Sequence, residues 1–145
     1  MSVLPPPSFP HGLAEAPKLP KPRRAWREKF RDALRGMKLG VRGHSSFFVH
    51  FFFTALVLAA AIVFRCGLYD WCLLLGCIGL VLTAELFNSA IETLFHGLDE
   101  ATKKRCHASL DIAAGAVLMA SITATVVGGL VFLERLRALL ALGGL

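Results

Sequence analysis

The segment "AELFNSAIETLF", residues 84–95, carries two carboxylates and one amide inside an otherwise apolar stretch. Glu85, Asn88 and Glu92 stand at positions i, i+3 and i+7, which an α-helix places on one face. Ionisable side chains within a membrane are costly and usually functional. Whether this segment crosses a bilayer therefore decides both the fold class and the kind of chemistry that the chain performs.

Three apolar runs predict three transmembrane helices. They cover residues 47–64, 72–95 and 112–133 of the 145-residue chain. At 1.5 Å per residue, runs of this length cross a hydrocarbon core of about 30 Å. Hydrophobic residues make up 55% of the sequence, which is high for a soluble domain of this size. The alternative, a soluble all-α bundle, is disfavoured by the long uncharged runs.

The sequence before the first run has two parts. All seven prolines lie in residues 1–22, which predicts a flexible or extended tail, because proline fixes φ and removes a backbone donor. Residues 23–43 predict a basic amphipathic helix on the anionic cytoplasmic face of a membrane, with an ordinary surface helix as the alternative. The apolar stripe of this helix recurs every three or four residues and consists of Trp26, Phe30, Ala33, Leu34, Met37 and Val41.

The positive charges predict the orientation of the spans. The net charge is +6, and ten of the sixteen Lys and Arg residues lie between Lys18 and Arg42. A second basic group, Lys103 to Arg105, follows the second run, so both segments belong on the cytoplasmic side. Residues 44–134 then form the membrane domain, and residues 135–145 form a helical extension or an interfacial tail outside, where Arg135 and Arg137 conflict mildly with this orientation.

Two other features narrow the class of protein. The sequence has no aromatic–basic platform or zinc-finger spacing, so we expect no nucleic-acid partner. Its four cysteines form no CxxC pair, and we expect unpaired thiols.

The polar residues of the second run are suited to phosphoryl transfer. A carboxylate in apolar surroundings holds a proton more readily than one in water, which suits a general base. A second carboxylate nearer to water is a suitable oxygen ligand for Mg²⁺. Such a pair can deprotonate a lipid hydroxyl that attacks a metal-bound phosphate. Asp111, at the cytoplasmic entrance to the third run, approaches the same membrane surface.

Two other interpretations of these polar residues remain. Interhelical hydrogen bonding accounts for Asn88 and Ser89 alone, but it does not require two glutamates on one face. A small proton-coupled transporter also uses a buried glutamate. Transporters, however, place such groups at the bilayer midplane and are built from paired repeats, and we find no repeat here.

The motif "AELFNSAIETLF", followed nineteen residues after Glu92 by Asp111 in "SLDIAAGAV", resembles the bacterial diacylglycerol kinase family, which includes undecaprenol kinases. The similarity extends from about Lys29 to Val131, with looser matches at "FRDALRGMK" and "SSFFVH". The resemblance implies a multi-pass protein of the bacterial inner (cytoplasmic) membrane, a trimeric helical bundle with active sites shared between protomers. It also implies transfer of the γ-phosphate of ATP, with Mg²⁺, to the hydroxyl of diacylglycerol or undecaprenol.

The resemblance also implies roles for individual residues. Glu85 matches the catalytic base and Glu92 a metal-holding carboxylate, while His44 stands at the second metal position. The nucleotide-site positions are Asp32, Asn88, Ala101, Thr102, Lys103 and Asp111. The segment that lines the path of the lipid contains Ser46, Phe47 and His50.

The chain departs from the family pattern at four positions. His44 replaces a second metal-binding Glu, and neutral imidazole is a poorer Mg²⁺ ligand than carboxylate. Leu110 replaces a phosphate-contacting Lys, Asp32 replaces a Tyr near the nucleotide, and His96 replaces an acid beyond Glu92. These departures favour a further alternative, a nucleotide- or lipid-binding membrane protein of the same fold with impaired catalysis.

Overall fold

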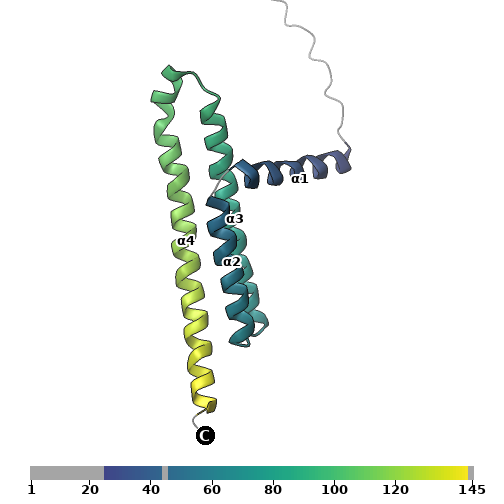
Figure 1. Cartoon of the computed structure of the whole chain (residues 1–145), viewed down its shortest axis with the longest axis vertical. Helices are drawn as coiled ribbons and strands as arrows, with labels where there is room; N and C mark the ends of the chain where they lie inside the picture. The colour runs from purple at the N-terminus through teal and green to yellow at the C-terminus, as the bar shows by residue number, and fades with distance from the viewer. Residues whose placement is uncertain (1–24, 44–45, 144–145) are drawn as a thin grey trace, which may run out of the picture.

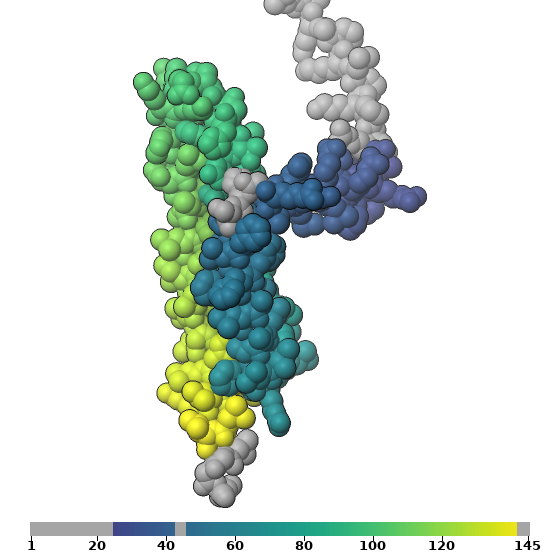
Figure 2. Space-filling model, viewed as in Figure 1, coloured from purple at the N-terminus to yellow at the C-terminus, as the bar shows by residue number. Residues whose placement is uncertain are grey.

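The computed structural model describes residues 25–43 and 46–143, and this part of the chain forms four α-helices (Figure 1). The helices are α1 (Trp26–Gly43), α2 (Ser46–Val63), α3 (Leu68–His96) and α4 (Glu100–Gly143). Helices α2, α3 and α4 run side by side, and α1 projects away from them (Figures 1 and 2). The predicted tail at residues 1–22 and the predicted metal ligand His44 lie outside the described residues.

The three predicted spans are confirmed. Helices α2, α3 and α4 are each long and apolar enough to cross a membrane. Their outer surfaces expose many large apolar side chains, such as Phe48 at 78% and Ile112 at 73%. A soluble protein rarely exposes so much contiguous apolar surface, whereas a lipid bilayer solvates it. The surface therefore excludes the soluble bundle and supports an all-α integral-membrane fold.

Helix α3 makes most of its interhelical contacts with α4, its antiparallel neighbour. Small side chains on α4, Ala113 and Ala120, are buried and allow the two backbones to approach closely. Near the α2–α3 connection, Ala61, Leu74 and Val131 form a small buried cluster that joins all three spans. Helix α2 thus packs against the hairpin that α3 and α4 form.

Helix α1 is amphipathic, as predicted. Its apolar residues Trp26, Phe30 and Leu34 are exposed, as an interfacial helix requires for contact with lipid. Its last turns meet α3 at Gly40, where an added Cβ would lie only 2.8 Å from Cδ2 of Leu86. The glycine therefore allows α1 to approach α3 one residue away from Glu85.

The connections between the spans are shorter than the sequence predicted. The predicted apolar runs leave residues 65–71 and 96–111 between them, but α3 begins at Leu68 and α4 at Glu100. Both starts are capped by a carboxylate: Asp70 accepts a hydrogen bond from the N–H of Gly67 at 2.8 Å, and Asp99 caps α4. Capping satisfies backbone donors that a helix start would otherwise leave unpaired. Residues 135–143 continue α4, so this part of the C-terminal segment is a helical extension.

Candidate active site

Glu85 is the buried carboxylate of the membrane domain. It lies on α3 with only 2% of its surface exposed. Its Oε2 lies 3.7 Å from Nε2 of His50 on α2, whose side chain is 18% exposed. Burying a carboxylate among apolar helices is costly, so such a group is usually paired and functional. The structure thus brings together a predicted catalytic residue and a predicted lipid-site residue from different helices.

Ser89 is a second buried polar residue next to Glu85, for which the sequence predicted only an interhelical hydrogen bond. It lies one helical turn after Glu85 and is 1% exposed. Ser89 Oγ and the second carboxylate oxygen, Glu85 Oε1, are both buried, and neither has a hydrogen-bond partner among the described residues. The feature of the sequence that could have identified Ser89 is its i, i+4 spacing from Glu85, which places the two side chains on the same face of a helix.

Asn88 and Glu92 differ in their relation to Glu85. At about 100° per residue, Glu92 is offset from Glu85 by about 20° around α3, and Asn88 by about 60° in the same direction. Asn88 lines a groove of about 770 Å³ between α3 and α4, together with Ser109 and Ile112. Glu92 is half-buried, about two turns nearer the α3–α4 connection. The amide therefore faces the α4 side of the helix rather than lying between the two carboxylates.

Asp111 lies at a depth similar to that of Glu85 but on a different surface. The two residues are each thirteen positions from Leu98 in the α3–α4 hairpin, so they occupy corresponding levels. The side chain of Asp111 is 78% exposed, and its Oδ2 lies 3.8 Å from Nδ1 of His107. Within one chain, Asp111 therefore faces outward, away from the buried carboxylate.

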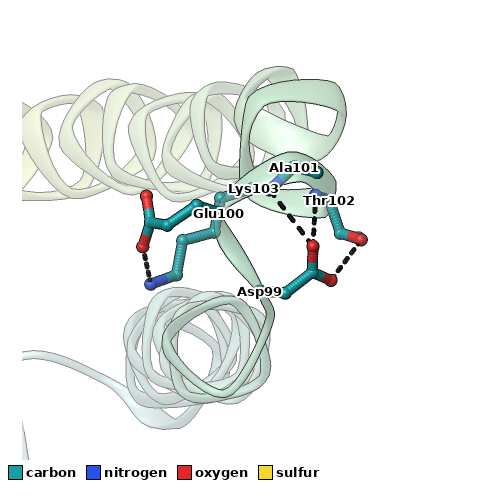
Figure 3. A network of polar contacts seen from close by, with 5 residues as sticks. All are labelled: Asp99, Glu100, Ala101, Thr102 and Lys103. Carbon is teal, nitrogen blue, oxygen red and sulfur yellow. Dashed lines mark hydrogen bonds and ion pairs between the residues drawn. The ribbon is translucent and has the colours of Figure 1, made fainter.

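The predicted nucleotide-contacting stretch, residues 101–103, forms the first turn of α4. The Asp99 carboxylate accepts hydrogen bonds from the backbone N–H groups of Ala101 and Thr102, both at 3.1 Å, and from Thr102 Oγ1 at 2.6 Å (Figure 3). These bonds, led by the Thr102 hydroxyl, lower the pKa of Asp99 below its usual value. Lys103 Nζ lies 2.9 Å from Glu100 Oε1. The backbone N–H groups of Ala101 and Thr102 are therefore already engaged within the chain, whereas the Lys103 ammonium has further N–H donors.

The remaining predicted residues lie on α1 and at the start of α2. Asp32 lies on α1, where its carboxylate is 3.9 Å from the guanidinium of Arg35. Ser46 is exposed at the first position of α2, whereas Phe47 is 2% exposed and its ring contacts that of Phe51. Of the predicted lipid-site residues, only His50 has an ion-pair contact with Glu85 in the structure.

The carboxylate of Glu92 is suited to a metal ion that binds together with a nucleotide. The described residues contain no cluster of three or more His, Cys, Asp or Glu side chains that could hold a metal ion. Mg²⁺ commonly uses only one or two protein carboxylates and takes its other ligands from phosphates and water. Glu92 offers such a carboxylate, so the chain satisfies this requirement without a dedicated metal cage.

A groove lined by all three spans begins at His50. It has a volume of about 380 Å³ and extends along α2, α3 and α4 to Leu74 and Gly128. Apart from His50 and Cys77, its lining contains no titratable side chain, and most of its surface is apolar. It can therefore hold a hydrocarbon chain with a polar end near His50.

Three apolar spans around a buried carboxylate define an integral-membrane protein with a buried polar site within the span region. Residues 31–132 match the prokaryotic diacylglycerol kinase family, and because this match covers more than half of the chain, the protein belongs to that family. It is a family of ATP-dependent lipid kinases. The comparisons with curated proteins and with solved structures found no match.

Proposed function

We propose that this protein transfers the γ-phosphate of ATP to the hydroxyl of a membrane lipid alcohol, either diacylglycerol or undecaprenol. The products are phosphatidate or the polyprenyl phosphate. The observation that carries the proposal is the burial of Glu85 at 2% exposure beside His50, at the head of an apolar groove. A lipid lying in that groove presents its polar end to the carboxylate.

In the proposed reaction, Glu85 is the general base. Its carboxylate accepts the proton of the lipid hydroxyl, and the lipid oxygen forms a bond to the γ-phosphorus of ATP. The bond between that phosphorus and the β,γ-bridging oxygen breaks, and ADP leaves with the electron pair. Positioned general bases contribute roughly 10²- to 10⁴-fold to such rates.

In this proposal, Glu92 holds the Mg²⁺ ion that accompanies ATP, because its carboxylate lies about two turns closer to the α3–α4 connection. When bound, Mg²⁺ offsets the negative charge of the phosphates during transfer. Asn88 and the first turn of α4, residues 101–103, face the nucleotide. His44 stands at the second metal position and Asp32 near the nucleotide, as the family resemblance implies.

The outward position of Asp111 supports a site that is completed between copies of the chain. Asp111 lies at the level of Glu85 but is 78% exposed, so a neighbouring protomer offers it a route to a shared nucleotide site. We therefore propose a homotrimer in the bacterial inner membrane, with the N-terminus in the cytoplasm. Native mass spectrometry of the detergent-solubilised protein tests the oligomeric state, and a monomer would contradict this arrangement.

One observation favours a second candidate function, a nucleotide- or lipid-binding protein with impaired catalysis. Leu110, which stands where the family resemblance expects a phosphate-contacting lysine, offers no charge to a phosphate. Nucleotide binding without phosphoryl transfer would support this function. Membership of a lipid kinase family favours the kinase over a proton-coupled transporter.

The direct test is a radiolabelled ATP assay on the purified protein in detergent. Diacylglycerol and undecaprenol are supplied separately, each with and without Mg²⁺. We expect labelled lipid with one of the two alcohols, only when Mg²⁺ is present. The Glu85→Gln variant keeps the size of the side chain but removes the base, and should lower kcat by roughly 10²- to 10⁴-fold.

Glu134→Gln is a matched control, because Glu134 is an exposed glutamate near the opposite end of α4. This variant should retain wild-type activity. The absence of labelled product from both alcohols would refute the proposed kinase function, whereas full activity of Glu85→Gln would refute only the assignment of the base.

A further inference from the structure

We propose that Ser89 and Glu85 together form a binding site for the hydroxyl of the lipid alcohol, with His50 as the residue that positions the carboxylate. This inference rests on the proposed function and assigns roles to Ser89 and His50 within the same site. Four polar atoms make up the proposed site: His50 Nε2, both oxygens of Glu85 and Ser89 Oγ.

Two polar atoms of this site are unsatisfied. Glu85 Oε1 and Ser89 Oγ are buried, and neither has a hydrogen-bond partner among the described residues. Buried polar atoms in native proteins are nearly always hydrogen-bonded, so two such atoms one turn apart indicate a site for a polar group. A carboxylate oxygen accepts, and a serine hydroxyl both donates and accepts. The pair therefore matches a single hydroxyl, which donates to Oε1 and accepts from Ser89.

Ser89 differs from three threonines of the spans in its hydrogen bonding. Thr93, Thr123 and Thr125 each donate to the backbone carbonyl four residues earlier, at 2.8 to 2.9 Å. This bond satisfies a hydroxyl within its own helix. Ser89 does not make it, although it is more deeply buried than these threonines. Its hydroxyl is therefore available to a ligand.

The other carboxylate oxygen of Glu85 contacts α2. Glu85 Oε2 faces His50 Nε2 at 3.7 Å, across the α2–α3 contact. In the proposed site, this imidazole holds Oε2 and leaves Oε1, which has no partner among the described residues, to the lipid hydroxyl. Contacts of this kind are often long before substrate binds and shorten in the reacting complex. His50 also lines the apolar groove, so the space that can hold the hydrocarbon chain of the lipid reaches a residue that contacts Glu85.

Ser89 and His50 have different roles in the proposed reaction. The lipid O–H donates its proton to Oε1, while the Ser89 O–H remains bonded to the lipid oxygen as this oxygen forms its bond to phosphorus. Ser89 therefore acts mainly in binding the alcohol. His50 does not touch the lipid hydroxyl and acts through the orientation of Glu85.

A binding experiment without ATP tests the hydroxyl site independently of turnover. The probes are a short-chain diacylglycerol and its analogue with hydrogen in place of the hydroxyl. Wild-type protein should bind the alcohol about fivefold more tightly than the analogue, as expected for one or two net hydrogen bonds. Ser89→Ala should reduce this preference, because only the hydrogen bond to Glu85 Oε1 remains. Thr93→Val removes a hydroxyl from the next turn of α3 and should leave the preference unchanged.

A kinetic experiment tests the role of His50. His50→Leu should lower kcat about a hundredfold with little change in the KM for lipid, because a misoriented group costs rate rather than binding. His50→Gln keeps a side-chain N–H near Oε2 and should restore most of kcat. A purely structural role of His50 predicts neither this split nor the rescue.

Specific results would overturn the inference. Equal binding of the alcohol and its analogue by the wild type, or an undiminished preference in Ser89→Ala, would refute the hydroxyl site. A wild-type kcat in His50→Leu, or equal losses in the Leu and Gln variants, would refute the positioning role. A lack of phosphoryl transfer by the wild type would instead refute the proposed function while the binding result still decides the hydroxyl site.

Discussion

Asp70 and Arg135, which are 65 residues apart in the sequence, form an ion pair that joins the start of α3 to the end of the third span in α4. Arg135 Nε donates to Asp70 Oδ2 at 2.5 Å, and its Nη2 contacts the same oxygen. The same oxygen accepts the backbone N–H of Gly67. This pairing explains how a positive charge is accommodated at the end of the spans that lies away from the α3–α4 connection.

Breaking this ion pair should destabilise the helix bundle. Asp70→Ala removes partners from both Arg135 and the Gly67 N–H, and should lower the free energy of unfolding by about 1.5–3 kcal/mol, the range for hydrogen bonds to charged groups. Arg137→Ala, an exposed arginine two residues further along α4, is the control and should change stability by less than about 0.5 kcal/mol. Denaturant titration in detergent measures both, and equal losses would contradict a specific role for the pair.

Leu110→Lys should improve nucleotide use. The substitution places a cation directly before Asp111, where the family resemblance expects a lysine that contacts phosphate. A charge-assisted contact of about 1.5–3 kcal/mol corresponds to a roughly ten- to hundredfold lower KM for ATP. Steady-state kinetics at saturating lipid measures the change. Ser109→Lys, one position earlier on α4, is the matched control, and an equal gain there would indicate a general effect of charge.

Gly36 and Gly40 should respond differently to alanine. A Cβ at Gly36 meets open space, so Gly36→Ala should stabilise α1 by about 0.5–1 kcal/mol through reduced backbone freedom. A Cβ at Gly40 lies 2.8 Å from Leu86 Cδ2 and forces this side-chain tip to move, so the gain should be smaller or reversed. Removing the tip with Leu86→Ala in a Gly40→Ala background should recover the gain relative to Leu86→Ala alone. Thermal melting of the set tests whether α1 packs against α3.

The start of α4 should loosen in acid. Hydrogen bonds from Thr102 and Ala101 lower the pKa of Asp99 below its ordinary value of 3.8. Because the folded pKa lies below the unfolded one, the cap stabilises the helix fully above about pH 4 and is lost as the pH falls through the lowered pKa. Amide hydrogen exchange at Ala101 and Thr102 should therefore lose protection in that range.

Asp99→Asn provides the control for this effect. Its amide oxygen still accepts the capping bonds but does not titrate in acid. The extra loss of protection at low pH should therefore disappear in the variant. The same acid dependence in Asp99→Asn would assign the loosening to another group.

The hydrophobic pattern of the sequence was sufficient to predict the three long apolar helices. Three long apolar runs predict three helices because only hydrogen-bonded helices or closed barrels satisfy backbone groups in hydrocarbon. The spacing of Glu85 and Glu92 likewise places them on one face of α3. The loop boundaries were less predictable, because Asp70 and Asp99 extend the helices by capping, and the capping role of an aspartate depends on its neighbours in space.

The sequence by itself therefore determined which segments are helical and which carboxylates lie within a span, since both follow from local periodicity and hydrophobicity. Only the tertiary structure decided the partners: His50 meets Glu85, Asn88 faces the α4 side, Asp111 faces outward, and Ser89 is buried without a partner among the described residues. These relations depend on how α2 and α4 rotate against α3. That rotation is set by packing around small residues such as Ala61 and Ala113, which no periodicity within a single helix specifies.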